Sequence, residues 1–184
     1  MKYELDEKSW ILQGVIPADI EYDFDALWSL HPENYGQIKI YGKLINTPRW
    51  TQSYCQSYWY SGMMHPVVDL PVQFEPFLAW ARSQDERFNQ VLVNWYAHGD
   101  HYIGAHTDNE SQIKKKSPIL SISLGDERIF RIRSKDTKQI IHNIPMQDKS
   151  YLIMCGETQQ HFTHEMPKSK SLNKRISLTF RIFN

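Results

Sequence analysis

The feature that most limits the possible folds is a series of short segments after residue 88 in which apolar and polar side chains alternate. Alternation with a period of two is typical of β-strands that bury one face, and turn residues separate these segments. The segments are VLVNWY (91–96), ILSISL (119–124), RIFRIR (128–133), KQIIHNI (138–144), SYLIMC (150–155) and RISLTFRI (175–182). So many short strands in one half of a chain predict a double-sheet jelly roll.

Two earlier segments have the apolar spacing of helices, residues 19–30 and residues 74–88, and Pro71 and Pro76 stand near the beginning of the second. Helices followed by antiparallel strands predict an α+β fold. We expect a jelly-roll, or double-stranded β-helix, core with the N-terminal helices packed on its outside. A length of 184 residues suits one structural domain. Within it, residues 1–87 would form the helical support and residues 88–184 the core.

The composition excludes several classes of protein. No stretch approaches the roughly 18 consecutive apolar residues of a membrane span, and the N-terminus lacks a signal-peptide pattern. Cys55 and Cys155 are too few for a disulfide framework. We therefore expect a soluble intracellular protein, cytoplasmic or, in a eukaryote, nuclear. No heptad or large apolar stripe demands a second copy, so a monomer is expected.

The net charge of zero conceals an uneven distribution. Residues 1–36 contain 2 basic and 8 acidic side chains, whereas residues 87–184 contain 15 basic and 9 acidic ones. An excess of positive charge in the C-terminal half suits an anionic partner, although ordinary solvated lysines would give the same count.

The last strand places its polar residues on one face. Arg175, Ser177, Thr179 and Arg181 alternate with Ile176, Leu178, Phe180 and Ile182, and the apolar set must face a core. If the polar face also points inward, its two guanidinium groups need anions, because a buried unpaired charge is costly. If that face is solvated, the two arginines are ordinary surface charges.

His106 and Asp108 stand two residues apart, so both side chains can project from one side of an extended segment. Two histidines and one carboxylate form the facial triad that binds Fe(II) and leaves coordination positions open. His161 or His164 could supply the third ligand. A hydrogen-bonded surface pair is the alternative interpretation.

The order of several motifs carries more information than any one of them. NWY (94–96), GDHYIGAHTDNE (99–110), SPILSISLG (117–125), HFTHEMP (161–167) and NKRISLTFR (173–181) together resemble the AlkB family of Fe(II)/2-oxoglutarate dioxygenases. IYGK (40–43), PR (48–49) and YWYSG (58–62) are similar to nucleotide-recognition segments of its eukaryotic DNA-repair branch, which would make part of residues 1–87 a nucleotide-recognition lid.

The resemblance implies two cofactors, Fe(II) and the cosubstrate 2-oxoglutarate. The iron ligands would be His106, Asp108 and His164, the last preferred to His161 because the family ligand stands just before a segment that ends in proline. The distal carboxylate of 2-oxoglutarate would pair with Arg175, helped by Tyr96 and Ser177. The carboxylate that chelates the metal would be held by Arg181 and Asn94, with Thr179 lining the same pocket.

The implied activity is the oxidative demethylation of bases such as 1-methyladenine and 3-methylcytosine in DNA, with RNA as a second candidate, and with release of succinate, carbon dioxide and formaldehyde. The partner would be alkylated DNA, single- or double-stranded. The alternatives are a hydroxylase with the same cofactors that acts on tRNA or protein, and a nucleic-acid-binding module with an idle iron site.

The same resemblance implies substrate contacts. Tyr60 would stack on an extruded base opposite His106, in an aromatic cluster with Tyr58 and Trp59, of which Trp59 is the best candidate for a core residue instead. Tyr41 would be a wedge at a hairpin tip with Gly42 and Lys43. Asn109 and Glu110 follow the aspartate ligand where the repair branch usually has further acidic residues, so Asn109 departs from the pattern.

Overall fold

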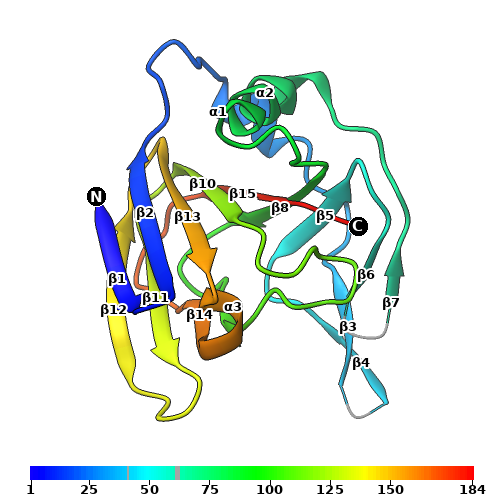
Figure 1. The fold of residues 1–184 in the computed structure, drawn as a ribbon. Coiled ribbons are helices and arrows are strands. Elements are labelled where there is room, and N and C mark those ends of the chain that lie inside the picture. The colour runs from blue at the N-terminus through cyan, green and yellow to red at the C-terminus, as the bar shows by residue number, and fades with distance from the viewer. Residues whose placement is uncertain (41, 61–62) are drawn as a thin grey trace.

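The protein is built on two facing antiparallel β-sheets (Figure 1). The structure is a computed structural model that describes residues 1–40, 42–60 and 63–184. The seven-stranded major sheet has the order β1 (Lys2–Asp6), β2 (Ser9–Val15), β13 (Ser150–Gly156), β10 (Ile119–Gly125), β15 (Arg175–Arg181), β8 (Gln90–Tyr96) and β5 (Trp50–Tyr54). The four-stranded minor sheet has the order β12 (Ile140–Met146), β11 (Arg128–Ser134), β14 (Phe162–Met166) and β9 (Ile103–His106).

Two hairpins extend from this core, β3 (Gln37–Ile40) with β4 (Lys43–Asn46) and β6 (Tyr58–Tyr60) with β7 (Met63–His65). The arrangement confirms the expected jelly roll. Three strands of the major sheet, β1, β2 and β5, precede residue 88, so the core expected over 88–184 also draws on the earlier part of the chain. None of the helices in the described ranges is long and apolar enough to cross a membrane.

The helices are shorter than their apolar patterns predicted. Helix α1 covers Phe24–Trp28, because the Asp23 carboxylate accepts hydrogen bonds from the amides of Asp25 and Ala26 and so fixes its first turn. A 3₁₀ turn (Val72–Phe74) precedes α2 (Glu75–Gln84), which ends where Asp85 becomes extended. A third helix, α3 (Thr158–His161), is a single turn.

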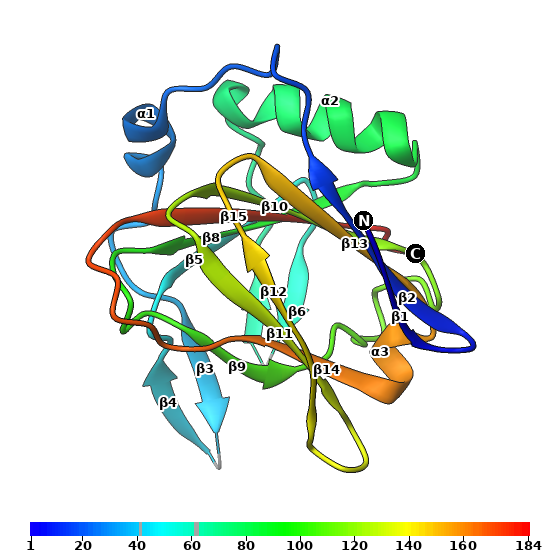
Figure 2. The same cartoon turned by 90° about the vertical axis from the view of Figure 1, so that its left-hand side faces the viewer.

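The outer face of the major sheet is covered by α2, which lies across its strands (Figure 2). Phe77 and Ala81 of α2 and Ile176, Leu178 and Phe180 of β15 belong to one buried apolar cluster. The alternation of β15 is thereby confirmed: its apolar face packs under the helices, and its polar face points into the space between the sheets. A second apolar cluster, which includes Ile132, Leu152 and Phe162, joins the two sheets at one end and leaves the other end open.

The packing of α2 against the sheet can be tested by a substitution at Phe77. Its side chain is fully buried, and its ring meets that of Tyr22 edge to face. Phe77→Ala should lower the free energy of unfolding by about 3–5 kcal/mol, because it removes a buried ring and leaves a cavity. Val72→Ala, at a position with the side chain exposed just before α2, should change it by less than about 0.5 kcal/mol. Urea denaturation of both variants measures the difference, and equal effects would contradict the packing described.

Candidate metal centre

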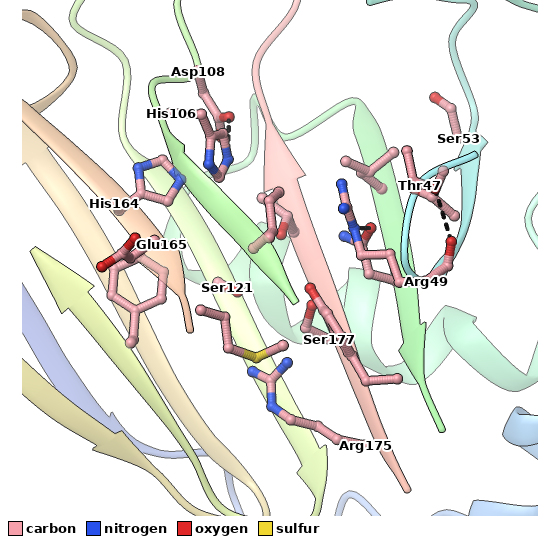
Figure 3. A pocket seen from close by; sticks show the side chains of 18 of the residues that line it. Thr47, Arg49, Ser53, His106, Asp108, Ser121, His164, Glu165, Arg175 and Ser177 are labelled. Carbon is pink, nitrogen blue, oxygen red and sulfur yellow. Dashed lines mark hydrogen bonds and ion pairs between the residues drawn. The ribbon is translucent and has the colours of Figure 1, made fainter. Parts of the chain in front are cut away.

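An open cleft lies between the sheets at the end that the second apolar cluster leaves free (Figure 3). Its walls include the polar side chains of β15 on the major sheet and His106 and His164 on the minor sheet. Of the residues expected to bind metal or cosubstrate, all nine line it: Asn94, Tyr96, His106, Asp108, His164, Arg175, Ser177, Thr179 and Arg181.

Strand pairing brings the two histidines together. Strands β9 and β14 are antiparallel neighbours, and His106 stands directly opposite His164, with ring centroids 4.2 Å apart. Asp108 follows β9, and its Oδ1 lies 3.6 Å from His106 Nε2. One ligand atom from each of the three residues lies within 4.8 Å of the others, so the group could hold a metal ion.

His161, the alternative third ligand, lies elsewhere. It ends α3, and its Nε2 is 3.2 Å from a carboxylate oxygen of Glu157. The structure therefore brings His164, and not His161, to the other two residues.

The imidazoles are oriented by their surroundings. His106 Nδ1 is 2.8 Å from the carbonyl oxygen of Gly104, which can only accept, so Nδ1 carries the proton and Nε2 is free to bind a metal. The His164 ring stacks on Phe130 with an interplanar angle of 15°. Burial lowers the pKa of both imidazoles, to about 3 for His164, so both are neutral near pH 7.

Asp108 is held as a carboxylate by Arg181. The Oδ2 atom of Asp108 accepts from Nε and Nη2 of Arg181, at 3.1 and 2.9 Å, and both side chains are almost fully buried. Burial alone would raise the pKa of Asp108, but Arg181 and the two imidazoles hold it well below its usual range. Two neutral imidazoles and one carboxylate are the donor set that suits a ferrous ion.

Sequence reasoning missed these contacts of Arg181. It assigned Arg181 and Asn94 to a carboxylate of the cosubstrate, whereas in the structure Arg181 binds Asp108 and Asn94 accepts a 2.8 Å hydrogen bond from Arg49 Nε. Arg49 is buried and lines the cleft, but the sequence marked it only as part of the PR motif. Gln159, whose Oε1 accepts from the amide of Asp108, gave no signal at all.

Arg175 provides an anion site at the other end of the cleft. Its Nε donates to Ser123 Oγ at 3.0 Å, and its guanidinium lies 5.3 Å from the centroid of the Tyr96 ring. Burial lowers the pKa of Arg175 to about 10, so the group stays charged at neutral pH. Its Nη1 is buried and has no hydrogen-bond partner among the described residues. A carboxylate bound here would satisfy that donor, so the residues present fit a dicarboxylate cosubstrate.

Comparison with known proteins agrees with this geometry. The family model described as the 2OG-Fe(II) oxygenase superfamily matches residues 29–181. The mouse protein named DNA oxidative demethylase ALKBH2 is 31% identical over 182 residues, which cover 90% of this chain and 71% of that protein. The chain belongs to the AlkB family of these oxygenases. Its cofactors are Fe(II) and 2-oxoglutarate.

Other relatives of this AlkB-family chain extend the comparison. The human DNA oxidative demethylase ALKBH2 is 31% identical over 90% of this chain and 65% of its own length. The bovine alpha-ketoglutarate-dependent dioxygenase alkB homolog 3 is 29% identical over 67% of this chain and 49% of its own length. The chain thus spans about two thirds of the mammalian ALKBH2 proteins it matches. The solved structure of OsALKBH1 has the same fold, with a TM-score of 0.65 at 15% identity over 98% of this chain and 99% of that one.

Of the described residues expected to contact the substrate of this AlkB-family chain, Tyr58 lines the cleft, whereas Trp59, Asn109 and Glu110 lie outside its lining. Tyr58 is buried in the cleft wall, and its hydroxyl donates to Glu110 Oε1 at 2.8 Å. Glu110 Oε2 is buried without a hydrogen-bond partner in the described part of the chain. Asn109 beside it is exposed. Trp59 is 51% exposed, so the interpretation of Trp59 as the core residue of this cluster was wrong: the alternation of β6 turns Tyr58 inward instead.

The remaining expected residues lie on the hairpins. Tyr60 ends β6. Gly42, with a φ of 79°, and the exposed Lys43 lie at the turn between β3 and β4, which agrees with a hairpin tip there. Tyr41, the expected wedge, lies outside the described residues.

The buried pair of Asp108 and Arg181 can be tested on the metal-free protein. Arg181→Met should lower the free energy of unfolding by about 3–5 kcal/mol, because it leaves a buried carboxylate without its cation. Arg87→Met is the control, since it breaks a 2.6 Å ion pair with Asp85 in which Arg87 is half exposed, and should cost far less stability than Arg181→Met. Guanidinium denaturation in the presence of a chelator gives both values, and similar losses would show that Asp108 does not depend on Arg181.

Proposed function

We propose that this protein removes alkyl groups oxidatively from base nitrogens in DNA, as an Fe(II)- and 2-oxoglutarate-dependent dioxygenase. The supporting observation is that one cleft is lined by the His106, Asp108 and His164 group, by Arg175 with its unsatisfied donor, and by Tyr58, whose hydroxyl donates to Glu110. The names of the mammalian relatives, which describe DNA oxidative demethylases, favour the same substrate.

Each wall of the cleft would have its own role. His106, Asp108 and His164 would hold Fe(II), and Arg175 with Tyr96 and Ser177 would hold the distal carboxylate of 2-oxoglutarate, while Ser123 accepts a hydrogen bond from Arg175 Nε. The chemistry that these cofactors would supply when bound is the hydroxylation of a methyl group by oxygen. Its products would be succinate, carbon dioxide and finally formaldehyde. Arg181 would keep Asp108 ionised and turned so that Oδ1 faces His106.

A base must leave the helical stack to reach this cleft, or come from a single strand. Glu110 Oε2 would accept a hydrogen bond from the exocyclic amino group of the base, since Tyr58 already occupies Oε1. Tyr60 at the end of β6 would stack on that base, and Gly42 and Lys43 would bring the β3–β4 turn to the nucleic acid. RNA as a substrate, a monomeric state and an intracellular location, nuclear in a eukaryote, remain predictions.

An assay of formaldehyde release decides among the candidate functions. The wild-type protein with Fe(II), 2-oxoglutarate and an oligonucleotide that contains 3-methylcytosine should release formaldehyde and restore cytosine. His106→Ala should abolish both, because it removes one of the three metal ligands. Succinate formation with tRNA or protein but not with methylated DNA would favour the hydroxylase. Nucleic-acid binding with no turnover on any substrate would favour the idle module.

Asn109 offers a test of lesion preference. 3-Methylcytosine is cationic, and a carboxylate added at position 109, beside Glu110, should favour it by about 1 kcal/mol, or roughly fivefold in catalytic efficiency. Asn109→Asp should therefore raise the catalytic efficiency on 3-methylcytosine and leave that on an uncharged etheno-adduct unchanged. Steady-state kinetics on the two oligonucleotides measure this. The uncharged lesion is the control, and equal changes on both would mean that charge at position 109 plays no part in selection.

A further inference from the structure

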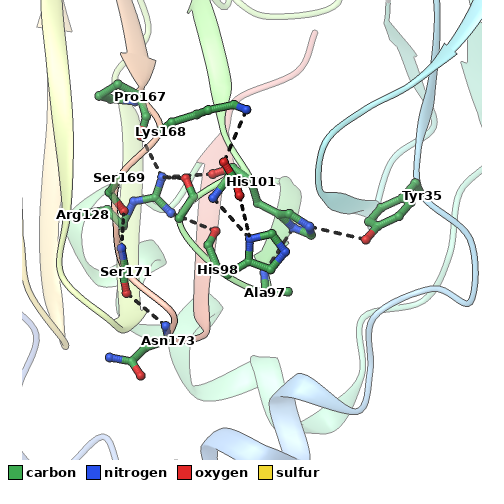
Figure 4. Close-up of polar contacts among 12 residues, drawn as sticks. Tyr35, Ala97, His98, His101, Arg128, Pro167, Lys168, Ser169, Ser171 and Asn173 are labelled. Carbon is green, nitrogen blue, oxygen red and sulfur yellow. Dashed lines mark hydrogen bonds and ion pairs between the residues drawn. The ribbon is translucent and has the colours of Figure 1, made fainter.

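Arg128, the first residue of β11, is buried between two loops, one of which also contacts Tyr35 through His101 (Figure 4). Its Nη2 donates to the carbonyl oxygens of Gly99, His101 and Pro167 at 3.3, 3.0 and 2.7 Å. Its Nη1 donates to that of His98 at 3.4 Å. One guanidinium thus holds backbone from both the 97–102 loop and the segment that starts at Pro167.

These two loops are connections between the sheets. Residues 97–102 join β8, which carries Asn94 and Tyr96, to β9, which carries His106. Residues 167–174 join β14, which carries His164, to β15, which begins at Arg175. Each loop therefore connects the wall that carries the two histidines with the wall that carries the anion site, and Arg128 ties the two loops together.

The loops also touch each other directly. The amide of Gly99 donates to the carbonyl of Ser171 at 2.6 Å, and the amide of Ser169 donates to the carbonyl of Gly99 at 2.9 Å. A Cβ at position 99 would lie 2.2 Å from the carbonyl oxygen of Ser169, so this approach requires glycine. If the two loops moved apart, both of these hydrogen bonds would break.

Arg128 makes no ion pair with any residue that the structure describes. Hydrogen bonds from Nη1 and Nη2 to loop carbonyls compensate part of its burial, whereas Nε is buried without a partner among the described residues. Charge-assisted bonds of this kind are the strong ones. Lysine carries one ammonium on a single stem and cannot reproduce a planar fork that reaches four carbonyls. The guanidinium therefore favours one arrangement of the two loops.

We propose that Arg128 is a positioning residue for the cosubstrate: by tying residues 97–102 to residues 167–171, it sets the distance between the His106–His164 wall and Arg175 that 2-oxoglutarate must span. The inference rests on the cofactors of the proposed function but not on its nucleic-acid substrate. Because the Tyr58–Glu110 pair belongs to other elements, loss of the clamp should weaken cosubstrate binding and spare nucleic-acid binding.

The test compares Arg128→Gln, Arg128→Lys and Gly99→Ala with a matched control. Arg82→Gln is that control, since Arg82 also donates from its guanidinium to a backbone carbonyl, that of Phe88 at 2.9 Å, but on α2 and outside the cleft lining. Three quantities are measured: the cosubstrate Kd from the visible charge-transfer band of the anaerobic Fe(II) protein titrated with 2-oxoglutarate, the Kd of an oligonucleotide, and amide exchange at Gly99 and Ser169.

Arg128→Gln should weaken the binding of 2-oxoglutarate by about tenfold, as expected when a binding geometry is loosened. Amide exchange at Gly99 and Ser169 should accelerate together, and the oligonucleotide Kd should stay the same. Arg128→Lys should fall between Gln and wild type, and Arg82→Gln should match wild type. Gly99→Ala should reproduce the weaker 2-oxoglutarate binding, which keeps the test decisive if Arg128→Gln does not fold.

An unchanged cosubstrate Kd in folded Arg128→Gln or Gly99→Ala would overturn the inference. So would proportional losses of 2-oxoglutarate and oligonucleotide binding, because they would indicate general destabilisation. A selective loss of 2-oxoglutarate binding in a protein that demethylates no base would support the role of Arg128 and contradict the proposed substrate instead.

Discussion

The ion pair of Asp108 and Arg181 is the interaction on which the cleft depends. A carboxylate and a guanidinium are both removed from water there, and each is stable only because the other is present. Arg181 ends β15 in the major sheet, whereas Asp108 follows β9 of the minor sheet. The pair therefore links the two sheets through charge at the open end, as the apolar cluster links them at the closed end.

Much of this arrangement could be predicted from the pattern of β15. The alternation of Arg175, Ser177, Thr179 and Arg181 with apolar residues fixed which side chains share a face, and the structure shows that the polar face is the inner one. The His106–Asp108 spacing gave two members of the metal-binding group for the same reason, since a short extended segment places them on one side. A regular alternation of apolar and polar residues over seven positions predicts the fold well, because it determines which side chains are buried.

Other parts of the site left no periodic signal. Strands β9 and β14 are short, and apolar and polar residues do not alternate in their sequences, IGAH and FTHEM, so nothing marked them as strands. Arg49 and Arg128 act through hydrogen bonds to distant groups, an amide oxygen in one case and loop carbonyls in the other. Carbonyls are present at every residue, so no sequence pattern identifies which of them an arginine will meet. Trp59 was misassigned because alternation gives two faces and does not say which one is inside.

The position of β15 also has a consequence for how the chain folds. It pairs with β10 on one side and β8 on the other, at the centre of the major sheet, yet every other strand of that sheet precedes it in the chain. During synthesis on the ribosome, β13 and β10 can pair, and so can β8 and β5, but the two halves stay separate until residues 175–181 emerge. Closure of the sheet, burial of its apolar face and assembly of the site thus become one late event. Until then, the nascent chain exposes two unpaired central edges, which is the stage at which it is most open to aggregation.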